Sequence, residues 1–435
     1  MEYSEALNKL GQFTRFGINL GLQRITSLLG ILGNPQEQVP LIHLGGTNGK
    51  GSTLAMLSSM LRESGYRVGT FISPHLVSYG ERFAINGMKI TEERLALLLE
   101  EIEGTLAEVQ GETGEAPTEF EVLTALAFLY FAREKVDVAL IEVGMGGDID
   151  STNVLKKPLL SVITNVSLDH QDYLGKTLVE IAEKKSGIIK PGCPILTASK
   201  DEEVLQVIRR KAQALQAPLL EVQQEASWQW QEESYGGQGQ YFTVRTLRYN
   251  YGKIFLPLSG EHQLGNAATA IVAAEILQEH GWQIPAQTIK QGLAKTKWPG
   301  RLEIVGRQPL FVLDGAHNPA GMNVLSQWLG RKKREVRRVL LVIGMLDDKD
   351  HHTAAELLAP LADLVIITKP NSCRARHWEE LSRNFQGYKL PVLVIENLTE
   401  ALQKAVQEAR EDDLILVTGS LYLIGEVKKI ITKQR

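Results

Sequence analysis

Residues 45–52, Gly-Gly-Thr-Asn-Gly-Lys-Gly-Ser, carry the residue types and spacing of a phosphate-binding loop. Glycines let backbone N–H groups turn toward phosphate oxygens, and Lys50 supplies a positive charge. The match to the general pattern is imperfect, because Leu44 stands at the first glycine position and Gly51 follows the lysine directly. A glycine-rich turn that caps a helix is the alternative, but it gives Lys50 no role. We therefore predict a nucleotide site that consists of Gly46, Thr47, Asn48, Gly49, Lys50, Gly51 and Ser52.

Other polar side chains follow apolar runs of the chain. Glu142 lies at the end of the run 136–143, and Ser73 follows the run 66–72. Because open parallel sheets bind ligands at the carboxyl ends of their strands, both side chains are candidates for a ligand site. His170 follows a third run, 159–166. The alternative for Glu142 is a charge that solvates a strand end, and for Ser73 it is a turn residue. The alternative for His170 is a buried histidine of the core.

These residues require a sheet that brings strand ends together, and the chain alternates strand-like runs with helical patterns. Such alternation is typical of a parallel α/β fold. In the first part we predict strands at 39–44, 66–72, 136–143, 159–166, 194–198 and 218–222, and helices at 52–63, 95–109, 120–135 and 263–280. In the last part we predict strands at 310–313, 339–343, 364–368, 392–395 and 414–417, each followed by a helix.

Residues 227–258 have a different pattern, with aromatic side chains among polar ones and glycines at 236, 237 and 239. This pattern predicts a hairpin or a small antiparallel meander. The strand–helix alternation restarts near Trp298. We therefore predict a large N-terminal P-loop NTPase-like domain over 1–297, with a mainly parallel sheet and a small antiparallel element. A smaller C-terminal Rossmann-like α/β domain is predicted over 298–435.

The composition excludes several classes of protein. Apolar residues make up 43% and charged residues 23% of the 435 residues, which excludes a mainly disordered chain. A net charge of −4 gives no basic field for nucleic acid or an anionic membrane. Two cysteines, Cys193 and Cys373, exclude a disulfide scaffold and favour a reducing cytoplasm. We expect neither a signal peptide nor a membrane-spanning segment.

Beyond the loop, a series of motifs makes the sequence resemble the folate branch of the Mur ligase superfamily. That branch comprises folylpolyglutamate synthase and bifunctional dihydrofolate synthase/folylpolyglutamate synthase, and the Gly-Lys-Gly-Ser at 49–52 is similar to its loop in particular. The other motifs, in the family's order, are Ser73-Pro74-His75, Tyr79-Gly80-Glu81-Arg82-Phe83, Asn86-Gly87, Thr118-Glu119-Phe120-Glu121, Glu142-Val143-Gly144-Met145-Gly146-Gly147, Asp169-His170, Glu183-Lys184-Lys185-Ser186-Gly187-Ile188, Gly260-Glu261-His262-Gln263-Leu264-Gly265-Asn266, Trp298-Pro299-Gly300-Arg301 and Asp314-Gly315-Ala316-His317-Asn318-Pro319.

The resemblance implies an ATP-dependent ligase that adds L-glutamate to the carboxylate of dihydropteroate, of (tetrahydro)folate, or of both. Transfer of the γ-phosphate would make the carboxylate an acyl phosphate, and cations must neutralise the two like-charged reactants. Two alternatives stay open at this point. A peptidoglycan Mur-type ligase would use the same kind of phosphate-binding loop, but the Gly-Lys-Gly-Ser sequence argues against it. A non-catalytic P-loop nucleotide-binding protein would not need Lys185, Arg301 and Asp314.

The resemblance also implies roles for single residues. Magnesium would be bound by Ser73, Glu142, His170 and Lys185, the last as a carbamate, and the catalytic residues would be Lys50, Lys185 and His317. The nucleotide would be contacted by His262, Asn266, Arg301 and Asp314, with Arg301 brought to the phosphates by domain closure. The folate side would include Arg82, Thr118, Phe120, Glu121, Ser151, Thr152 and Asn153. Phe120 is also typical of a helix core, and Arg82 of a surface charge.

The implied cofactors are ATP, Mg²⁺ at two sites and a monovalent cation such as K⁺. The implied partners are small-molecule substrates only, and the implied state is a monomer. The chain departs from the family at Asp148, where Gly-Gly-Arg-x-Asp is usual, so an anion replaces a cation beside the metal and the substrate. A basic loop over 369–376 suits the carboxylate of an amino acid.

Overall fold

The buried strand-like runs of the N-terminal part form one sheet around β1 (Leu41–Gly45), all of whose residues are buried. A strand that is covered on both faces reads as a continuous apolar run, and this is why the sequence predicts it. In sheet order, the eight strands in the described part of the chain are β4 (Met88–Lys89), β3 (Phe83–Ile85), β2 (Val68–Phe71), β5 (Val138–Glu142), β1, β6 (Leu160–Ile163), β7 (Ile195–Thr197) and β8 (Leu219–Glu221). Among the strands described in this sheet, β3 pairs antiparallel with both β2 and β4. The other neighbouring strands pair parallel, so the predicted mainly parallel sheet is confirmed.

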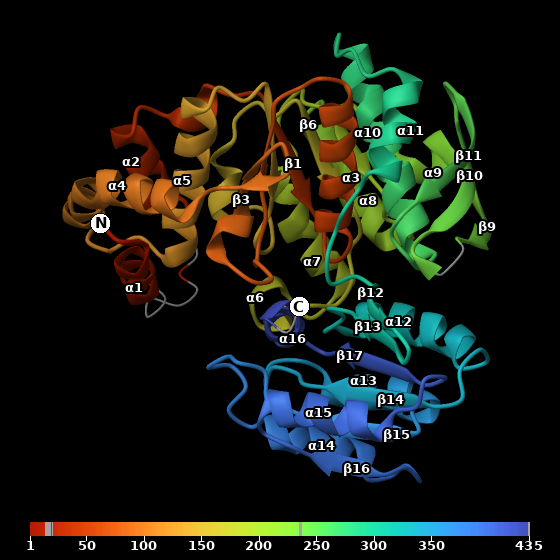
Figure 1. Cartoon of the computed structure of the whole chain (residues 1–435). Coiled ribbons are helices and arrows are strands. Elements are labelled where there is room, and N and C mark those ends of the chain that lie inside the picture. The colour runs from red at the N-terminus through yellow and green to blue at the C-terminus, as the bar shows by residue number, and fades with distance from the viewer. Residues whose placement is uncertain (14–18, 20, 235–236, 434–435) are drawn as a thin grey trace. The chain divides into compact units, whose positions relative to one another are not determined.

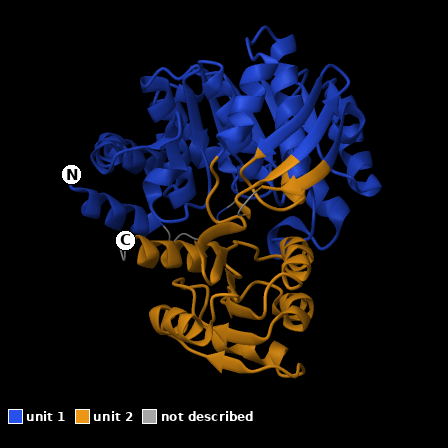
Figure 2. Cartoon of the chain, turned by 45° about the vertical axis from the view of Figure 1, so that its right-hand side comes forward, with its two compact units in different colours: residues 1–229, 242–255, 264–296 blue, residues 230–241, 256–263, 297–435 orange. Residues whose placement is uncertain are grey.

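The computed structural model describes residues 1–13, 19, 21–234 and 237–433 (Figure 1). The chain divides into two compact units (Figure 2). The first contains 1–229, 242–255 and 264–296, and the second contains 230–241, 256–263 and 297–435. No helix in the described part is long and apolar enough to cross a membrane.

Helices cover the central sheet of the first unit and pack against a large apolar core (Figure 1). The helices up to residue 294 are α1 (Tyr3–Phe13), α2 (Gln23–Ile31), α3 (Lys50–Glu63), α4 (Glu92–Thr113), α5 (Glu119–Arg133), α6 (Gln171–Leu174), α7 (Leu178–Lys185), α8 (Glu202–Ala214), α9 (Val222–Glu225), α10 (His262–Glu279) and α11 (Ala286–Ala294). Short 3-10 helices are η2 (Pro35–Glu37), η3 (Tyr79–Arg82), η4 (Ser151–Val154) and η5 (Ser186–Ile188). α1 and α2 were not predicted from the sequence.

Residues 227–258, which have aromatic side chains among polar ones, contribute a three-stranded sheet. Its strands are β9 (Ala226–Glu233), β10 (Gln240–Thr246) and β11 (Asn250–Leu256), in the order β11-β10-β9. The predicted small antiparallel element is therefore confirmed. A buried carboxylate on α10 anchors this sheet, because Glu275 Oε1 accepts hydrogen bonds from Thr246 Oγ1 at 2.7 Å and from the Tyr251 hydroxyl at 2.8 Å.

The second unit is built on a six-stranded mixed sheet, as expected for a Rossmann-like α/β domain. Its strands in sheet order are β12 (Glu303–Arg307), β13 (Leu310–Leu313), β17 (Leu414–Thr418), β14 (Val339–Ile343), β15 (Leu364–Ile367) and β16 (Val392–Val394). Its helices after residue 300 are α12 (Pro319–Lys332), α13 (His351–Leu358), η7 (Ala359–Leu361), η8 (Trp378–Glu380), α14 (Leu381–Phe385), α15 (Leu398–Glu408) and α16 (Leu421–Lys433). β12 pairs antiparallel at the edge, is half-buried and contains a register shift, so its sequence lacks a clear strand pattern.

An ion pair fixes the start of α5 in the core of the first unit. Arg24 Nε donates to Glu121 Oε2 at 3.1 Å, and the two side chains are only 7% and 1% exposed. Glu121 also accepts the Thr118 N–H, which completes the N-terminal cap of α5. Removal of one partner of a buried pair leaves the other charge uncompensated.

We therefore expect Arg24→Met to destabilise the first unit by about 3–5 kcal/mol. Urea unfolding followed by circular dichroism measures the change. Lys156→Met is the control, because Lys156 is 77% exposed and pairs with the exposed Glu37; its effect should stay within about 0.5 kcal/mol. Equal urea midpoints for the two variants would contradict this assignment.

Candidate functional site

The glycine-rich loop follows β1 and ends where α3 begins. Gly46 and Gly49 have φ values of +129° and +87°, a region that favours glycine. A Cβ atom on Gly46 would lie 2.1 Å from Thr164 Oγ1, so only glycine fits against the neighbouring strand end. A Cβ atom on Gly49 would lie 2.5 Å from Asn266 Oδ1, which places the predicted nucleotide ligand Asn266 beside the loop.

Residues directly after β6 brace the loop. Thr47 N donates to Asn165 O and Asn48 N donates to Asn165 Oδ1, both at 2.8 Å. Thr164 Oγ1 donates to Asn48 O at 2.7 Å. The loop is therefore held in shape by hydrogen bonds within the protein. Sequence reasoning missed Thr164 and Asn165, because their role depends on β6 lying next to β1 in the sheet.

Two lysine side chains meet at one carbonyl oxygen of the loop. Lys50 Nζ donates to Gly46 O and to Thr47 O, each at 3.2 Å, and Lys185 Nζ donates to Gly46 O at 2.9 Å. Lys185 ends α7 and is 5% exposed. Burial, and next the positive charge of Lys50, lower the pKa of Lys185 to about 7. At neutral pH a large fraction of Lys185 therefore carries an uncharged amine.

Glu142 places a buried carboxylate at the same edge. The register pairs Leu44 of β1 with Glu142 of β5, and Glu142 Oε1 lies 3.9 Å from Lys50 Nζ. Its Oε2 accepts the N–H of Ser73 at 3.4 Å. Asp169 is close enough to oppose the fall in the pKa of Lys185, and the next residue, His170, has its Nε2 atom 4.0 Å from Asp169 Oδ2. The structure thus brings Lys50, Ser73, Glu142 and Lys185 together and places Asp169 near them.

The donor set can be tested for its fit to magnesium. Within the described ranges, no three His, Cys, Asp or Glu side chains gather into a metal-binding group. Mg²⁺ in nucleotide sites takes one or two protein oxygens and completes its shell with phosphates and water. The Glu142 carboxylate beside Ser73 fits this pattern, because it supplies a hard oxygen next to the phosphate loop.

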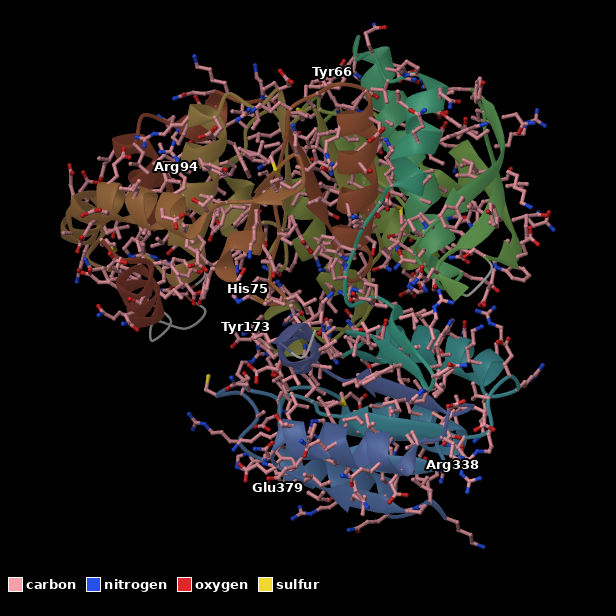
Figure 3. The ribbon with its side chains drawn as sticks, viewed as in Figure 1. Tyr66, His75, Arg94, Tyr173, Arg338 and Glu379 are labelled. Atoms are coloured by element: carbon pink, nitrogen blue, oxygen red, sulfur yellow. The ribbon has the colours of Figure 1, made fainter. Side chains whose placement is uncertain are left out.

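The residues predicted for the folate side lie in two places. Arg82 Nε donates a hydrogen bond to Nδ1 of His75, which Figure 3 labels, at a distance of 3.0 Å. The Arg82 guanidinium lies 5.3 Å from the centre of the Tyr79 ring. Phe120 stacks on Phe71 with ring centres 5.9 Å apart. Thr118 and Glu121 form the cap of α5 described above, so their polar atoms bind the helix start.

Ser151, Thr152 and Asn153 form η4 and are buried. Thr152 has no exposed surface, and Asn153 Nδ2 donates to Asp148 O at 3.0 Å and to Gly187 O at 3.2 Å. The side-chain nitrogen of Asn153 is therefore used in hydrogen bonds to neighbouring parts of the first unit. Asp148, the departure from the family pattern, forms an ion pair with Lys184 at 3.2 Å.

The second unit contains a cluster around Asp314 at the end of β13. The buried Asp314 carboxylate accepts the N–H groups of Leu302 and Ala316, each at 2.9 Å. Burial raises its pKa, whereas the guanidinium of Arg301 acts in the opposite direction. His317 Nδ1 lies 2.8 Å from Gly315 O. Burial, Arg301 and Arg331 lower the pKa of His262 to about 4, which keeps this imidazole neutral.

Comparisons with known proteins cover the whole chain. Residues 44–274 match the Mur ligase middle domain, and residues 300–421 match the Mur ligase glutamate ligase domain. The dihydrofolate synthase/folylpolyglutamate synthase of Bacillus subtilis is 38% identical over 431 residues, which is 98% of each chain. The folylpolyglutamate synthase of Mycobacterium tuberculosis complexed with ADP is 32% identical, with a TM-score of 0.91 and 99% of each chain covered. A solved folylpolyglutamate synthase–AMPPCP–folate complex is 34% identical, with a TM-score of 0.85, and covers 99% of this chain and 100% of that one.

Because the pKa of Lys185 is low, the free energy of unfolding should depend on pH through this residue. Its pKa falls from 10.5 to about 7, so between these values the unfolded chain binds more protons than the folded one. The contribution of Lys185 to stability therefore rises with pH through this window. We expect Lys185→Met to be more stable than the wild type at pH 7, on the order of a few kcal/mol, with a smaller gain at pH 10.

Urea unfolding of both proteins at pH 7 and pH 10, in buffer free of bicarbonate, measures the gain. Lys184→Met is the matched control, since Lys184 is the preceding residue and its side chain is 41% exposed. Its difference from the wild type should not depend on pH. The same flat profile for Lys185→Met would show that Lys185 has an ordinary pKa.

Proposed function

The chain belongs to the folylpolyglutamate synthase/dihydrofolate synthase family of Mur ligases and is an ATP-dependent ligase; we propose that it adds L-glutamate to the carboxylate of dihydropteroate, of a reduced folate, or of both. The observation that carries this proposal is the convergence of Lys50, Lys185 and Glu142 at the glycine-rich loop. Such a site supplies positive charge for phosphates and a carboxylate for a metal in one place.

The proposed reaction joins two anions, a phosphate and a carboxylate, before the amine attacks. The loop N–H groups and Lys50 would bind the phosphates and stabilise the charge on the transferred group. Mg²⁺, when bound by Glu142 and Ser73, would supply further positive charge to the phosphate oxygens. Glutamate nitrogen then displaces phosphate from the acyl phosphate, and an amide forms.

We further propose that Lys185 is carbamylated. An uncharged amine attacks CO₂, a new N–C bond forms, and one proton leaves, so the product carries a negative charge. The buried position and the pKa of about 7 support this step, because a fully protonated lysine would not react. The carbamate would give the Lys185 position an anionic oxygen ligand for a second Mg²⁺ ion.

Other parts of the proposal rest on the resemblance. His170 would bind magnesium; His262, Asn266, Arg301 and Asp314 would contact the nucleotide; and His317 would act on the reacting groups. The folate would contact some of Arg82, Thr118, Phe120, Glu121, Ser151, Thr152 and Asn153. The proposal also includes a monovalent cation such as K⁺ and a monomeric, cytoplasmic protein.

A phosphate-release assay tests the reaction. With ATP and Mg²⁺, we expect release only when glutamate is present together with dihydropteroate or, in a separate reaction, with tetrahydrofolate. Lys50→Ala should lower the rate by about two orders of magnitude or more, because it removes charge next to the transferred phosphate, and it should leave the melting temperature nearly unchanged. Lys176→Ala, at an exposed position on the same unit, is the control. Release without both substrates would contradict the ligase reaction proposed for this chain.

Carbon-13 NMR with labelled bicarbonate tests the carbamate. We expect one carbamate signal in the wild type and in Lys184→Ala, and none in Lys185→Ala. Turnover should be lost in Lys185→Ala and nearly kept in Lys184→Ala, and a short carboxylic acid at high concentration should restore part of it by filling the ligand position. Equal losses of turnover in the two variants would refute the proposed role of Lys185.

A further inference from the structure

A buried chain of hydrogen bonds runs from β1 to the segment that follows Glu142. His43, in the middle of β1, has no exposed surface, and its Nε2 atom lies 2.8 Å from Thr152 Oγ1. Thr152 Oγ1 in turn donates to Asp150 Oδ1, which also accepts the Thr152 N–H at 3.0 Å. The other oxygen of Asp150 accepts the N–H of Met145 at 2.8 Å. We call these three residues, His43, Thr152 and Asp150, the relay.

The direction of the relay follows from the number of protons that each group holds. Thr152 has one hydroxyl proton, which it donates to Asp150 Oδ1. The same oxygen must therefore accept from His43, which assigns the proton of this imidazole to Nε2. Burial lowers the pKa of His43 to about 3, so the ring stays neutral. Within the described part of the chain His43 Nδ1 has no hydrogen-bond partner, which leaves Thr152 as the polar contact that orients this ring.

The segment that the relay holds also contacts the C-terminal turn of α7. Asp148 N donates to Lys184 O at 3.0 Å. A Cβ atom on Gly147 would lie 2.6 Å from Lys184 O and 2.8 Å from Lys185 O, so the two backbones touch. Lys185 then extends its amine to Gly46 O at 2.9 Å. These contacts close a ring. The relay connects β1 to residues 145–148, these residues contact the backbone at Lys185, and the Lys185 amine returns to the loop after β1.

We propose that His43, Thr152 and Asp150 are positioning residues that hold residues 144–148 in place and thereby keep the Lys185 amine on the Gly46 carbonyl. The proposal rests on the ligase function proposed above and assigns Thr152 and Asp150 to the scaffold of the site. A buried network in which each hydroxyl both donates and accepts is rigid, because loss of one member leaves its neighbours unpaired. Small displacements of a reacting group lower turnover strongly without a matching effect on binding.

Thr152→Val tests the relay, since it keeps the shape of the side chain and removes only the hydroxyl. Hydrogen–deuterium exchange should show faster exchange in peptides that cover residues 143–149, where Met145 N–H loses its fixed acceptor, while α8 and the three-stranded sheet stay protected. In the assay for substrate-dependent phosphate release, kcat should fall by about ten- to a hundredfold, with the KM for ATP changed less than about threefold.

Thr152→Ser is the matched control, because it restores the hydroxyl; its exchange pattern and kcat should approach those of the wild type. If Thr152→Val does not fold, Asp150→Asn replaces one acceptor of the relay and should give the same two changes. Unchanged exchange over residues 143–149, an unchanged kcat, or equal losses in the valine and serine variants would each overturn the proposal. A wild type that releases no phosphate would refute the ligase reaction instead, and the exchange measurement would still decide whether the relay holds the segment.

Discussion

Two ammonium groups cannot share one carbonyl oxygen without cost, yet Lys50 and Lys185 both donate to Gly46 O. The arrangement is stable when one of them gives up its proton, and the buried Lys185 is the one that does so near neutral pH. Lys50 keeps a carboxylate partner, Glu142, at 3.9 Å. The site therefore combines Lys50, a buried carboxylate and an amine of lowered pKa within reach of one loop.

The sheet order makes this arrangement possible. β1 lies between β5 and β6, so the loop after β1 emerges between Glu142 on one side and Thr164 with Asn165 on the other. The carboxyl ends of parallel strands meet at one edge, and side chains from distant parts of the sequence are neighbours there. A Cβ atom on Gly46 would overlap with the bracing Thr164 side chain, and a Cβ atom on Gly49 would lie against the Asn266 amide. Both positions also have the positive φ values that favour glycine.

The sequence predicts the parts of the fold that depend on buried apolar runs. β1, β5 and the strands β14, β15 and β17 of the second unit are such runs, and the glycine-rich loop is a local motif, so the sequence predicts both. The packing of α1 and α2 and the bracing by Asn165 could not be predicted, because they depend on which elements become neighbours. The role of a buried polar residue depends on its neighbours in the fold, which a sequence pattern does not show. Thr152 is buried and bonded to His43 and Asp150, and the sequence alone does not separate this scaffold role from contact with a substrate.

A titration of the Lys185 amine shows whether two charged lysines or only one share the Gly46 carbonyl. Carbon-13 labelling of the lysine ε-carbons, with Lys185→Met used to assign the signal, allows this amine to be titrated by NMR in protein without nucleotide or bicarbonate. We expect a pKa near 7 for Lys185, well below the ordinary lysine value of about 10.4. A Lys185 amine that stays protonated up to pH 10 would rule out both a neutral Lys185 at the Gly46 carbonyl and its reaction with CO₂.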